Sequence, residues 1–400
     1  MQYLDFLGLS YSANSNQAVG LFEQAIESYL QFKPDTMAKL NSLTDQEMVS
    51  PMAQILKGYL LKMGSDPRFT ANIQKCLEWL NNAELNHREK LHLDAFKDWL
   101  NDDINTALDR FELILETYPT DIIALKAAHN LYFYQGDADS MHRSVARVLP
   151  AWEEHSWKGY VLGLYSFGLE ESGHYERAET TGREAVTLNP NDLWAAHAVT
   201  HVCQMQSRWQ DGQTWLNERF PDWTDTNNFV YHLHWHQALL HLSSGDSDAA
   251  LEIYDQILTK PLQDDLYLDV CNAASMLWRL QMQGHDVTDR WRVLQQWQHR
   301  ATDDELIFIT LHYLMAPAVR NDKPALETIR TWGERSGRQA SICKTIGLKT
   351  AEAIVELGQE RTISGIKKLK QVEDHLYTIG GSHAQRQLFS DLIHHYSATS

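Results

Sequence analysis

Two stretches of this 400-residue chain carry histidines four residues apart. His197 and His201 lie in WAAHAVTHVCQM, and His232 and His236 lie in YHLHWHQAL. Residues four apart share one face of a helix, so each pair can direct two imidazoles into the same space. Imidazole titrates near neutral pH, exchanges protons and binds metals. These four histidines are therefore the predicted catalytic residues, acting as general acids or bases.

The first pair belongs to a polar stripe on its predicted helix. Trp194, His197, His201, Gln204 and Arg208 follow one another at steps of three, four, three and four residues, as one helix face requires. An ordinary repeat helix would use this stripe for core packing, and a single buried histidine commonly only forms a hydrogen bond. Burying so many polar groups without water or ligand is costly, so a binding site is an equally good interpretation.

Further residues are expected to reach the same space. In a stack of helix pairs the inner helices lie side by side, so the two histidine pairs should converge, with Trp194 and Trp235 as flat apolar walls. His129 in KAAHN, His312 in ITLHY and His383 in GGSHAQR hold corresponding motif positions elsewhere in the chain. We expect these three histidines to contact the same ligand.

The motif GGSHAQRQLF predicts the start of a helix with Ser382 as its N-cap and His383 and Arg386 one turn apart. Backbone amides and the helix dipole favour an anion there, and arginine can hold a carboxylate or phosphate with two bonds. The alternative is an ordinary N-cap with the arginine bracing a neighbouring helix. In the anion interpretation, Arg386 and Arg208 hold the ligand.

A zinc site is the alternative to histidine acid–base chemistry. A His-x3-His pair chelates zinc, and His232 or His236 could complete the ligand set. No HExxH-type glutamate accompanies the pair, so no metal is predicted. The sequence also lacks GxGxxG, GxxxxGK and a nucleophile elbow, and we expect no organic cofactor.

Charge and cysteine usage narrow the class of protein. With 35 Lys and Arg against 53 Asp and Glu, the formal charge of -18 argues against nucleic-acid binding. No apolar stretch approaches the length of a membrane span, and the N-terminus has no cationic leader. The four cysteines are far apart without a CxxC pair, which indicates reduced thiols in a cytoplasmic protein.

The residues that position these side chains repeat along the chain. An alanine precedes a proline by twelve residues three times, in steps of 71, at Ala107 and Pro119, Ala178 and Pro190, and Ala249 and Pro261. This step is close to two tetratricopeptide units of 34 residues. We therefore predict an all-α, TPR-like α-solenoid, a right-handed superhelix of antiparallel helix pairs around a concave inner pocket. An irregular helical region (1–101), the helix-pair array (102–288) and closing C-terminal helices (289–400) form its parts.

With these segments in view, the whole chain resembles the tetratricopeptide repeat protein 38 family. YSFGLEE, NPNDLWAAHAVTHVCQM, HLHWHQAL and GGSHAQRQLF carry the resemblance. The chain departs from the pattern of that family where acidic residues are replaced by neutral ones, at Asn130, Gln204, Asn272, Thr310 and Gln387. If the family site uses carboxylates, the resemblance implies that this member has lost them.

Two functions remain open from the sequence. The first is an enzyme or binding protein for a small anionic organic molecule, with histidine acid–base chemistry such as isomerisation, elimination or hydrolysis. The second is a scaffold that holds a peptide or protein partner, for which a solvent-open groove lined with lysine, arginine and asparagine would be typical. Histidine and tryptophan at the stripe positions favour the first. Substrate, reaction and oligomeric state do not follow from the sequence.

Overall fold

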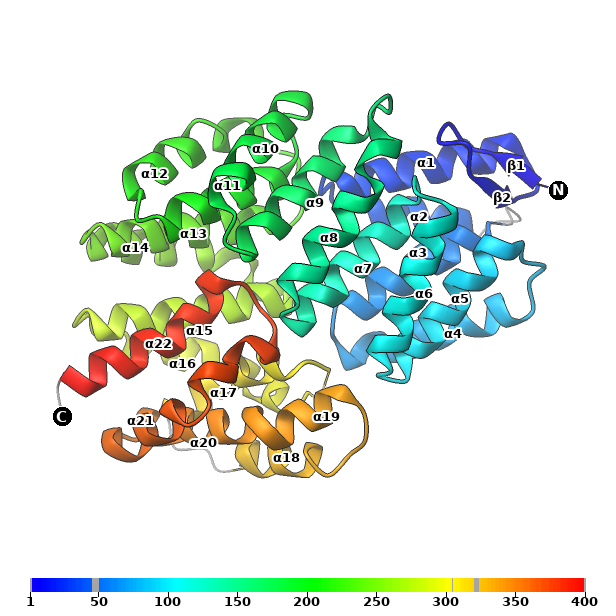
Figure 1. The fold of residues 1–400 in the computed structure, drawn as a ribbon. Coiled ribbons are helices and arrows are strands. Elements are labelled where there is room, and N and C mark those ends of the chain that lie inside the picture. Colours follow the sequence, from blue (N-terminus) through cyan, green and yellow to red (C-terminus); the bar gives the residue numbers. More distant parts are fainter. Residues whose placement is uncertain (1, 45–49, 304, 320–323, 399–400) are drawn as a thin grey trace. The chain divides into compact units, whose positions relative to one another are not determined.

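Helices make up most of the structure, a computed structural model that describes residues 2–44, 50–303, 305–319 and 324–398. The described residues form twenty-two α-helices and a two-stranded antiparallel sheet (Figure 1). The predicted all-α class is confirmed. The sequence did not predict the sheet, in which β1 (Gln2–Leu4) pairs with β2 (Ser10–Ser12).

The chain divides into two compact units. Unit 1 comprises residues 1–132, 137–202 and 217–230, and unit 2 comprises residues 133–136, 203–216 and 231–400. Four of the boundaries fall inside helices, in α7 (Ile122–Gln135), α11 (Leu193–Met205), α12 (Trp209–Asn217) and α13 (Phe229–Ser243). The predicted superhelix with its concave pocket would involve both units and stays a prediction, as do the three predicted parts.

Unit 1 is built from successive helices that pack on one another, such as α1 on α2, α5 on α6, and α9 on both α8 and α10. The bounds of its other helices are α1 (Asn16–Leu30), α2 (Thr36–Thr44), α3 (Pro51–Met63), α4 (Thr70–Asn81), α5 (His87–Leu100), α6 (Ile104–Thr117), α8 (Ala138–Val148), α9 (Lys158–Glu171) and α10 (Tyr175–Leu188). Gly173, with φ +80°, makes the tight turn between α9 and α10, a backbone conformation that glycine adopts without strain.

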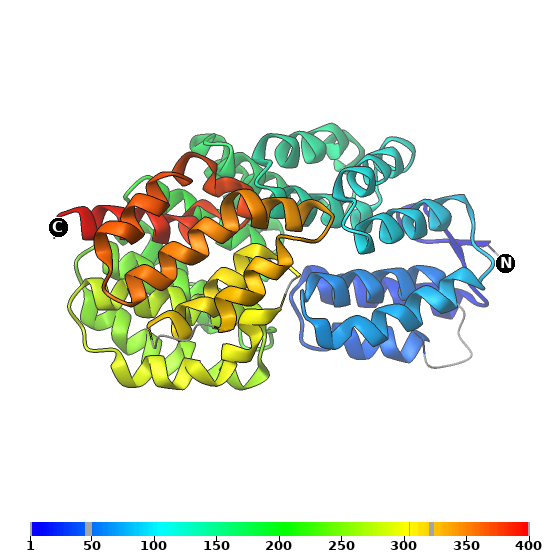
Figure 2. The same cartoon turned by 90° about the horizontal axis from the view of Figure 1, so that it is seen from below.

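Unit 2 follows the same plan around its own apolar core, which contains the buried Trp235, Trp278 and Trp291. Seen from below, α20, α21 and α22 pack in succession (Figure 2). The bounds of its helices are α12 (Trp209–Asn217), α14 (Ser247–Ile253), α15 (Tyr267–Met282), α16 (Thr288–Leu294), α17 (Ile307–Val319), α18 (Pro324–Trp332), α19 (Arg338–Ile342), α20 (Leu348–Gly358), α21 (Thr362–Lys370) and α22 (His383–Ala398). Gly245, with φ +86°, turns the chain before α14.

The 71-residue repeat holds in its first two copies and is distorted in the third. Ala107 and Ala178 are fully buried on α6 and α10, where small side chains allow close helix packing. In the third copy Ala250 is the buried alanine, and Ala249 is only half-buried. A π-helical turn (Tyr254–Leu258) follows α14 directly, and such turns insert an extra residue into a helix.

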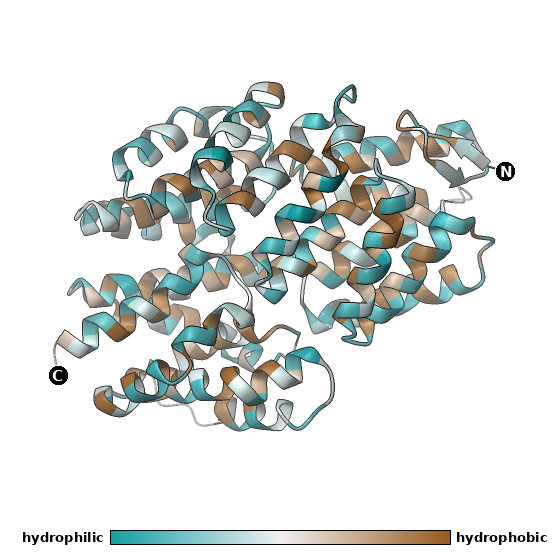
Figure 3. Cartoon of the chain, viewed as in Figure 1, coloured by the Kyte–Doolittle hydropathy of each residue, from teal (hydrophilic) through white to brown (hydrophobic). Residues whose placement is uncertain are grey.

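Hydrophobic and hydrophilic residues alternate along most helices (Figure 3), as expected for helices that bury one face. Within the described part of the chain, no helix has both the length and the apolar character needed to cross a bilayer.

Candidate functional site

Asp192 starts the helix that carries the first histidine pair. One oxygen of its carboxylate accepts hydrogen bonds from the backbone N–H groups of Trp194 (3.0 Å) and Ala195 (3.1 Å), which is the action of an N-cap. The helix α11 then places Trp194, His197 and His201 on one face, within unit 1.

The predicted stripe does not extend to Arg208. Ser207 adopts φ +58°, its N–H bonds the Gln204 carbonyl, and the N–H of Arg208 bonds the carbonyl of Cys203. This is a Schellman ending, which closes the helix. Arg208 therefore lies outside α11, and its guanidinium is 3.5 Å from the carboxylate of Asp211. The prediction that all five residues share one helix face was wrong for Arg208.

His197 and His201 form a contacting pair of buried rings. Their Nε2 atoms lie 3.0 Å apart and their ring centroids 4.4 Å apart. Phe167 stacks on His197 at 5.3 Å and meets His201 edge-on at 5.4 Å. Because two nitrogens at this distance share one hydrogen bond, the tautomer of one ring determines that of the other.

Two glutamates of α9 face the other side of His201. The Nδ1 atom of His201 is 3.3 Å from Oε2 of Glu170 and 3.8 Å from Oε1 of Glu171. All three side chains are buried. The sequence analysis missed both glutamates, although they end the motif YSFGLEE.

Trp194 lies at the centre of an aromatic cluster in unit 1. Its ring is 4.6 Å from Phe167, 5.2 Å from His197, 5.6 Å from Phe229 and 5.8 Å from His129, between centroids. Neither ring nitrogen of His129 nor Nε1 of Trp194 has a hydrogen-bond partner among the described residues. Burial lowers the pKa of His129 to about 3, so this ring is neutral at pH 7.

A buried lysine adjoins this cluster. The ammonium of Lys126 lies 4.6 Å from the ring of Tyr29 and 5.4 Å from that of Phe32, which stacks on Phe229. Burial lowers the pKa of Lys126 and raises that of Asp192, and the two charges partly offset these shifts. The sequence analysis missed Lys126, although it lies one helical turn before His129 in KAAHN.

The second histidine pair belongs to unit 2 and is held by neutral amides. His232 Nδ1 is 3.1 Å from Oδ1 of Asn272, and its ring stacks on Trp235 at 5.2 Å. His236 Nδ1 is 3.4 Å from Oε1 of Gln204. Gln204 and Asn272, two of the five neutral residues named in the sequence analysis, therefore lie beside these histidines with their amide oxygens.

The other three neutral positions bond elsewhere. Asn130 donates to the sulfur of Met63, Thr310 to the carbonyl of Asp303, and Gln387 to the carboxylate of Asp391.

The remaining predicted residues of unit 2 make internal bonds. His312 Nδ1 donates to the carbonyl of Phe308 at 2.8 Å, and burial lowers its pKa to about 4. Arg386 donates to the carbonyl of Gly381. Both side chains thus bond backbone carbonyls of their own unit, and their contact with a ligand stays a prediction.

The GGSHAQR motif forms a capping box at the start of α22. Ser382 accepts a bond from the Gln385 N–H, and the Gln385 side chain accepts one from the Ser382 N–H. His383 begins the helix that follows. The geometry favours the N-cap interpretation over the anion site.

The structure therefore brings His129, Trp194, His197 and His201 together in unit 1. His232, Trp235 and His236 form a second group, within unit 2. The expected convergence of the two pairs involves both units and stays a prediction.

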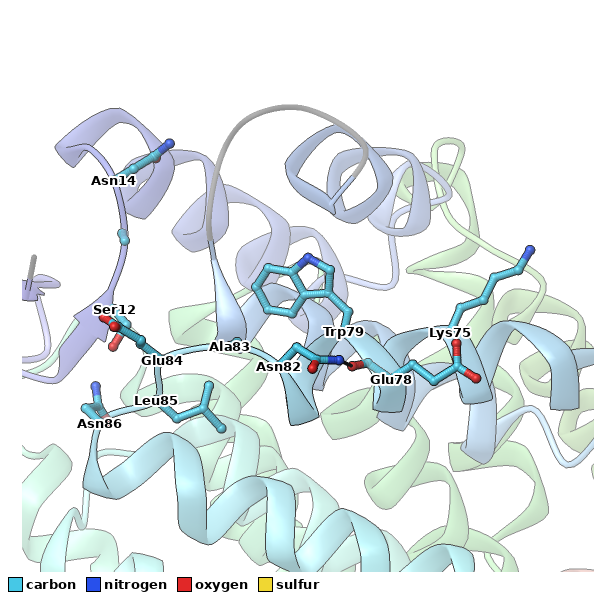
Figure 4. A pocket seen from close by; sticks show the side chains of 11 residues that line it. Ser12, Asn14, Lys75, Glu78, Trp79, Asn82, Ala83, Glu84, Leu85 and Asn86 are labelled. Carbon is cyan, nitrogen blue, oxygen red and sulfur yellow. Dashed lines mark hydrogen bonds between the residues drawn. The ribbon is translucent and has the colours of Figure 1, made fainter.

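An open hollow lies elsewhere in unit 1, beside β2 and α4. Its volume is about 1070 Å³. Figure 4 shows Trp79 and Lys75 on α4, and Asn82 donating to the carbonyl of Glu78 (2.8 Å). The hollow is lined by Ser12, Ala13, Asn14, Lys75, Glu78, Trp79, Asn82, Ala83, Glu84, Leu85 and Asn86. This lining combines one lysine and three asparagines with two glutamates and no arginine, so it matches only part of the lining expected of a scaffold.

Comparison with known proteins shows a similarity to tetratricopeptide-repeat proteins at the level of sequence. A TPR repeat-containing protein of Synechococcus elongatus is 25% identical over 116 residues, which are 28% of this chain and 29% of that protein. The chain is similar to tetratricopeptide-repeat proteins. This match spans under a third of the length of the relative. The more specific resemblance to the tetratricopeptide repeat protein 38 family stays a prediction. No known protein-family profile matches the chain.

Two solved structures are similar in fold. A tetratricopeptide repeat protein from Parabacteroides merdae gives a TM-score of 0.40 at 12% identity, over 78% of this chain and 98% of that one. A Rap protein in complex with Competence and Sporulation Factor gives a TM-score of 0.44 at 10% identity, over 96% and 99%. Neither likeness bears on what this chain binds.

Proposed function

We propose that the aromatic and histidine cluster of unit 1 binds a small anionic organic molecule, and that His197 and His201 exchange a proton with it without an organic cofactor. The observation that carries this proposal is the set of buried polar atoms on His129 and Trp194 that no described residue satisfies. Buried donors without a partner are costly, and native proteins retain them mainly where a ligand or water completes them.

The surroundings of these atoms favour an anion with an apolar part. Lys126 supplies a buried positive charge beside Phe32, which stacks at 6.5 Å on Trp194. The indole N–H of Trp194 can donate to a carboxylate or phosphate oxygen, and the aromatic rings form apolar walls. Lys126 thus takes the role that the sequence analysis assigned to Arg208 and Arg386.

The order Glu170, His201, His197 supports proton exchange. A carboxylate beside one nitrogen of an imidazole orients that ring and stabilises its charged form, as in catalytic triads. The opposite nitrogen of His201 meets His197 at 3.0 Å, so a proton can pass between the two rings. His197 is then the group that faces Phe167, Trp194 and the proposed ligand.

A thermal-shift panel tests the binding. Benzoate, phenylacetate, succinate and phenyl phosphate are added to the purified full chain, to K126M and to W194F, with H87Q as the control because His87 is exposed in the same unit. At least one acid should raise the Tm of the wild type and of H87Q by several degrees, and that rise should be lost in K126M and W194F. Equal shifts in all four proteins, or none in the wild type, would contradict the proposal.

A deuterium-exchange assay tests the chemistry. Exchange of the C–H next to the carboxylate of phenylacetate or succinate in heavy water reports proton abstraction even when no product forms. The wild type and H87Q should incorporate deuterium, and H197A and H201A should not. Incorporation at wild-type rate by both variants would remove the histidines from the reaction and leave the binding proposal intact.

A scaffold is the second candidate, because the hollow beside α4 offers the lysine and asparagines expected for peptide binding. If this is the function, K75E and W79A should abolish capture of a peptide partner, whereas K126M should not. The buried, reduced state of all four cysteines supports a cytoplasmic location for either function.

A further inference from the structure

We infer that Glu170, Glu171 and His201 form a binding site for one divalent transition-metal ion, with zinc as the best fit. The three residues offer two carboxylate oxygens and one imidazole nitrogen, which lie within 4.8 Å of one another. All three belong to unit 1. This inference does not depend on the proposed function, because the ion could bind whether or not an organic anion does. If both proposals hold, the ion lies beside the organic ligand.

The distances between these atoms match the edges of a zinc coordination shell. Ligands about 2.1 Å from zinc at tetrahedral angles are about 3.4 Å apart. The His201 Nδ1 atom is 3.3 Å from Glu170 and 3.8 Å from Glu171. Charge-assisted hydrogen bonds are shorter, about 2.7–2.9 Å. The spacing therefore fits an ion between the groups better than a direct bond.

The three donors come from two packed helices. Glu170 and Glu171 are adjacent on α9, and both carboxylates face the same nitrogen of His201 on α11. All three side chains are buried, so the donors are held in place by the surrounding core.

His197 holds the ring of His201 in the orientation that metal binding requires. When Nδ1 of a ligating histidine binds a metal, its Nε2–H usually donates to an outer partner that fixes the ring. The Nε2 atom of His197 lies 3.0 Å from the Nε2 atom of His201 and can be this partner. The pair thus presents the lone pair of Nδ1 to the two glutamates.

The donor set selects the type of ion. Calcium takes six to eight oxygen ligands and magnesium prefers octahedral oxygen shells with water. A nitrogen and two carboxylates suit zinc and related first-row ions, and a catalytic zinc has three protein ligands with a fourth position for water or substrate. That fourth position would accept an oxygen of a small organic anion.

The test is a titration of the chelator-treated full chain with zinc by calorimetry, and with cobalt(II) by visible absorption, without any organic acid present. The wild type and the control E176Q, whose glutamate is exposed on α10, should bind one equivalent and give the intense spectrum of tetrahedral cobalt. E170Q, E171Q and H201Q should each lose at least about tenfold in affinity, and H197Q should weaken binding by about tenfold.

The inference is overturned if the wild type takes up no stoichiometric zinc, or if E170Q and E171Q bind as tightly as the wild type. Circular dichroism checks the folding of each variant. If H201Q does not fold, the loss of zinc affinity in E171Q tests the site in its place. Because no organic acid is present, failure here leaves the anion proposal standing. Conversely, an unchanged thermal shift in K126M would contradict the anion proposal and leave the metal site standing.

Discussion

The Nε2 atom of His201 lies 3.0 Å from the Nε2 atom of His197, while its Nδ1 atom lies 3.3 Å from Glu170. Both nitrogens of one buried ring therefore have polar neighbours fixed on α9 and α11. This relationship links the proposed proton exchange to the proposed metal site, because a proton or an ion at Nδ1 determines what His201 offers to His197.

Removing His197 should destabilise the protein. H197A takes away a neighbour of a fully buried imidazole and leaves a cavity beside Phe167, so we expect a loss of about 2–4 kcal/mol in the free energy of unfolding. Urea unfolding at pH 7 measures it, with H87A expected to change stability by less than about 0.5 kcal/mol. Equal values for the two variants would contradict the buried contact.

Acid should destabilise the fold through His129 and His312. Burial lowers their pKa values to about 3 and about 4, against 6.5 for an exposed histidine. Between these values the unfolded chain binds protons that the folded chain does not, so stability rises with pH and is lost as the pH falls below about 6.5.

The effect of pH can be assigned to one ring by comparing H312Q with the wild type. From pH 6.5 to pH 4.5 the wild type should lose about 2–3 kcal/mol more than H312Q. Urea unfolding at several pH values measures the difference. Parallel pH profiles for the two proteins would show that His312 is accessible to protons in the folded state.

Asp192 should act through both its cap and its charge. D192A removes the acceptor of the Trp194 and Ala195 N–H groups and should cost about 1 kcal/mol, whereas D192N retains the cap and should cost less. D192N also removes the carboxylate whose charge raises the pKa of Lys126. Acylation of Lys126, measured by mass spectrometry over a pH series, should therefore begin at lower pH in D192N than in the wild type. An unchanged pH profile would show that the charge of Asp192 does not affect Lys126.

Two glycines give a matched test of helix packing in unit 1. A Cβ at Gly168 on α9 would lie 2.8 Å from the backbone of His142, whereas a Cβ at Gly20 on α1 meets nothing within 4 Å. G168A should destabilise by about 1–3 kcal/mol, and G20A should stabilise by about 0.5–1 kcal/mol. Shifts of the same sign in thermal unfolding would contradict the packing of α8 on α9.

The fold was predictable where local signals repeat. The alanine and proline steps, with Asp121 and Asp192 one period apart, predict α6, α7, α10 and α11 because caps and close packing act over a few residues. The end of α11 was not predictable in this way, because Ser207 takes a left-handed conformation more typical of glycine. The π-helical turn after α14 distorts the third copy for a similarly local reason.

The site was only partly predictable. The one-turn spacing of His197 and His201 predicts that the rings share a face, and the structure brings them into contact. Glu170 and Lys126 were missed because they come from α9 and α7, and which side chains of different helices meet depends on helix rotation and packing. Conversely, Arg386 has the residue type of an anion site, yet one of its guanidinium N–H groups donates to the Gly381 carbonyl in the loop that precedes α22.

The most direct test of the account is a crystal structure of the full chain with whichever of the four panel acids raises the Tm most. We predict density for that acid in unit 1, with its carboxylate or phosphate within hydrogen-bonding distance of Trp194 Nε1 and its carbon skeleton against Phe167 and Phe229. Density for the acid in the hollow beside Trp79, or an unfilled cluster around Trp194 at saturating acid, would contradict the central claim.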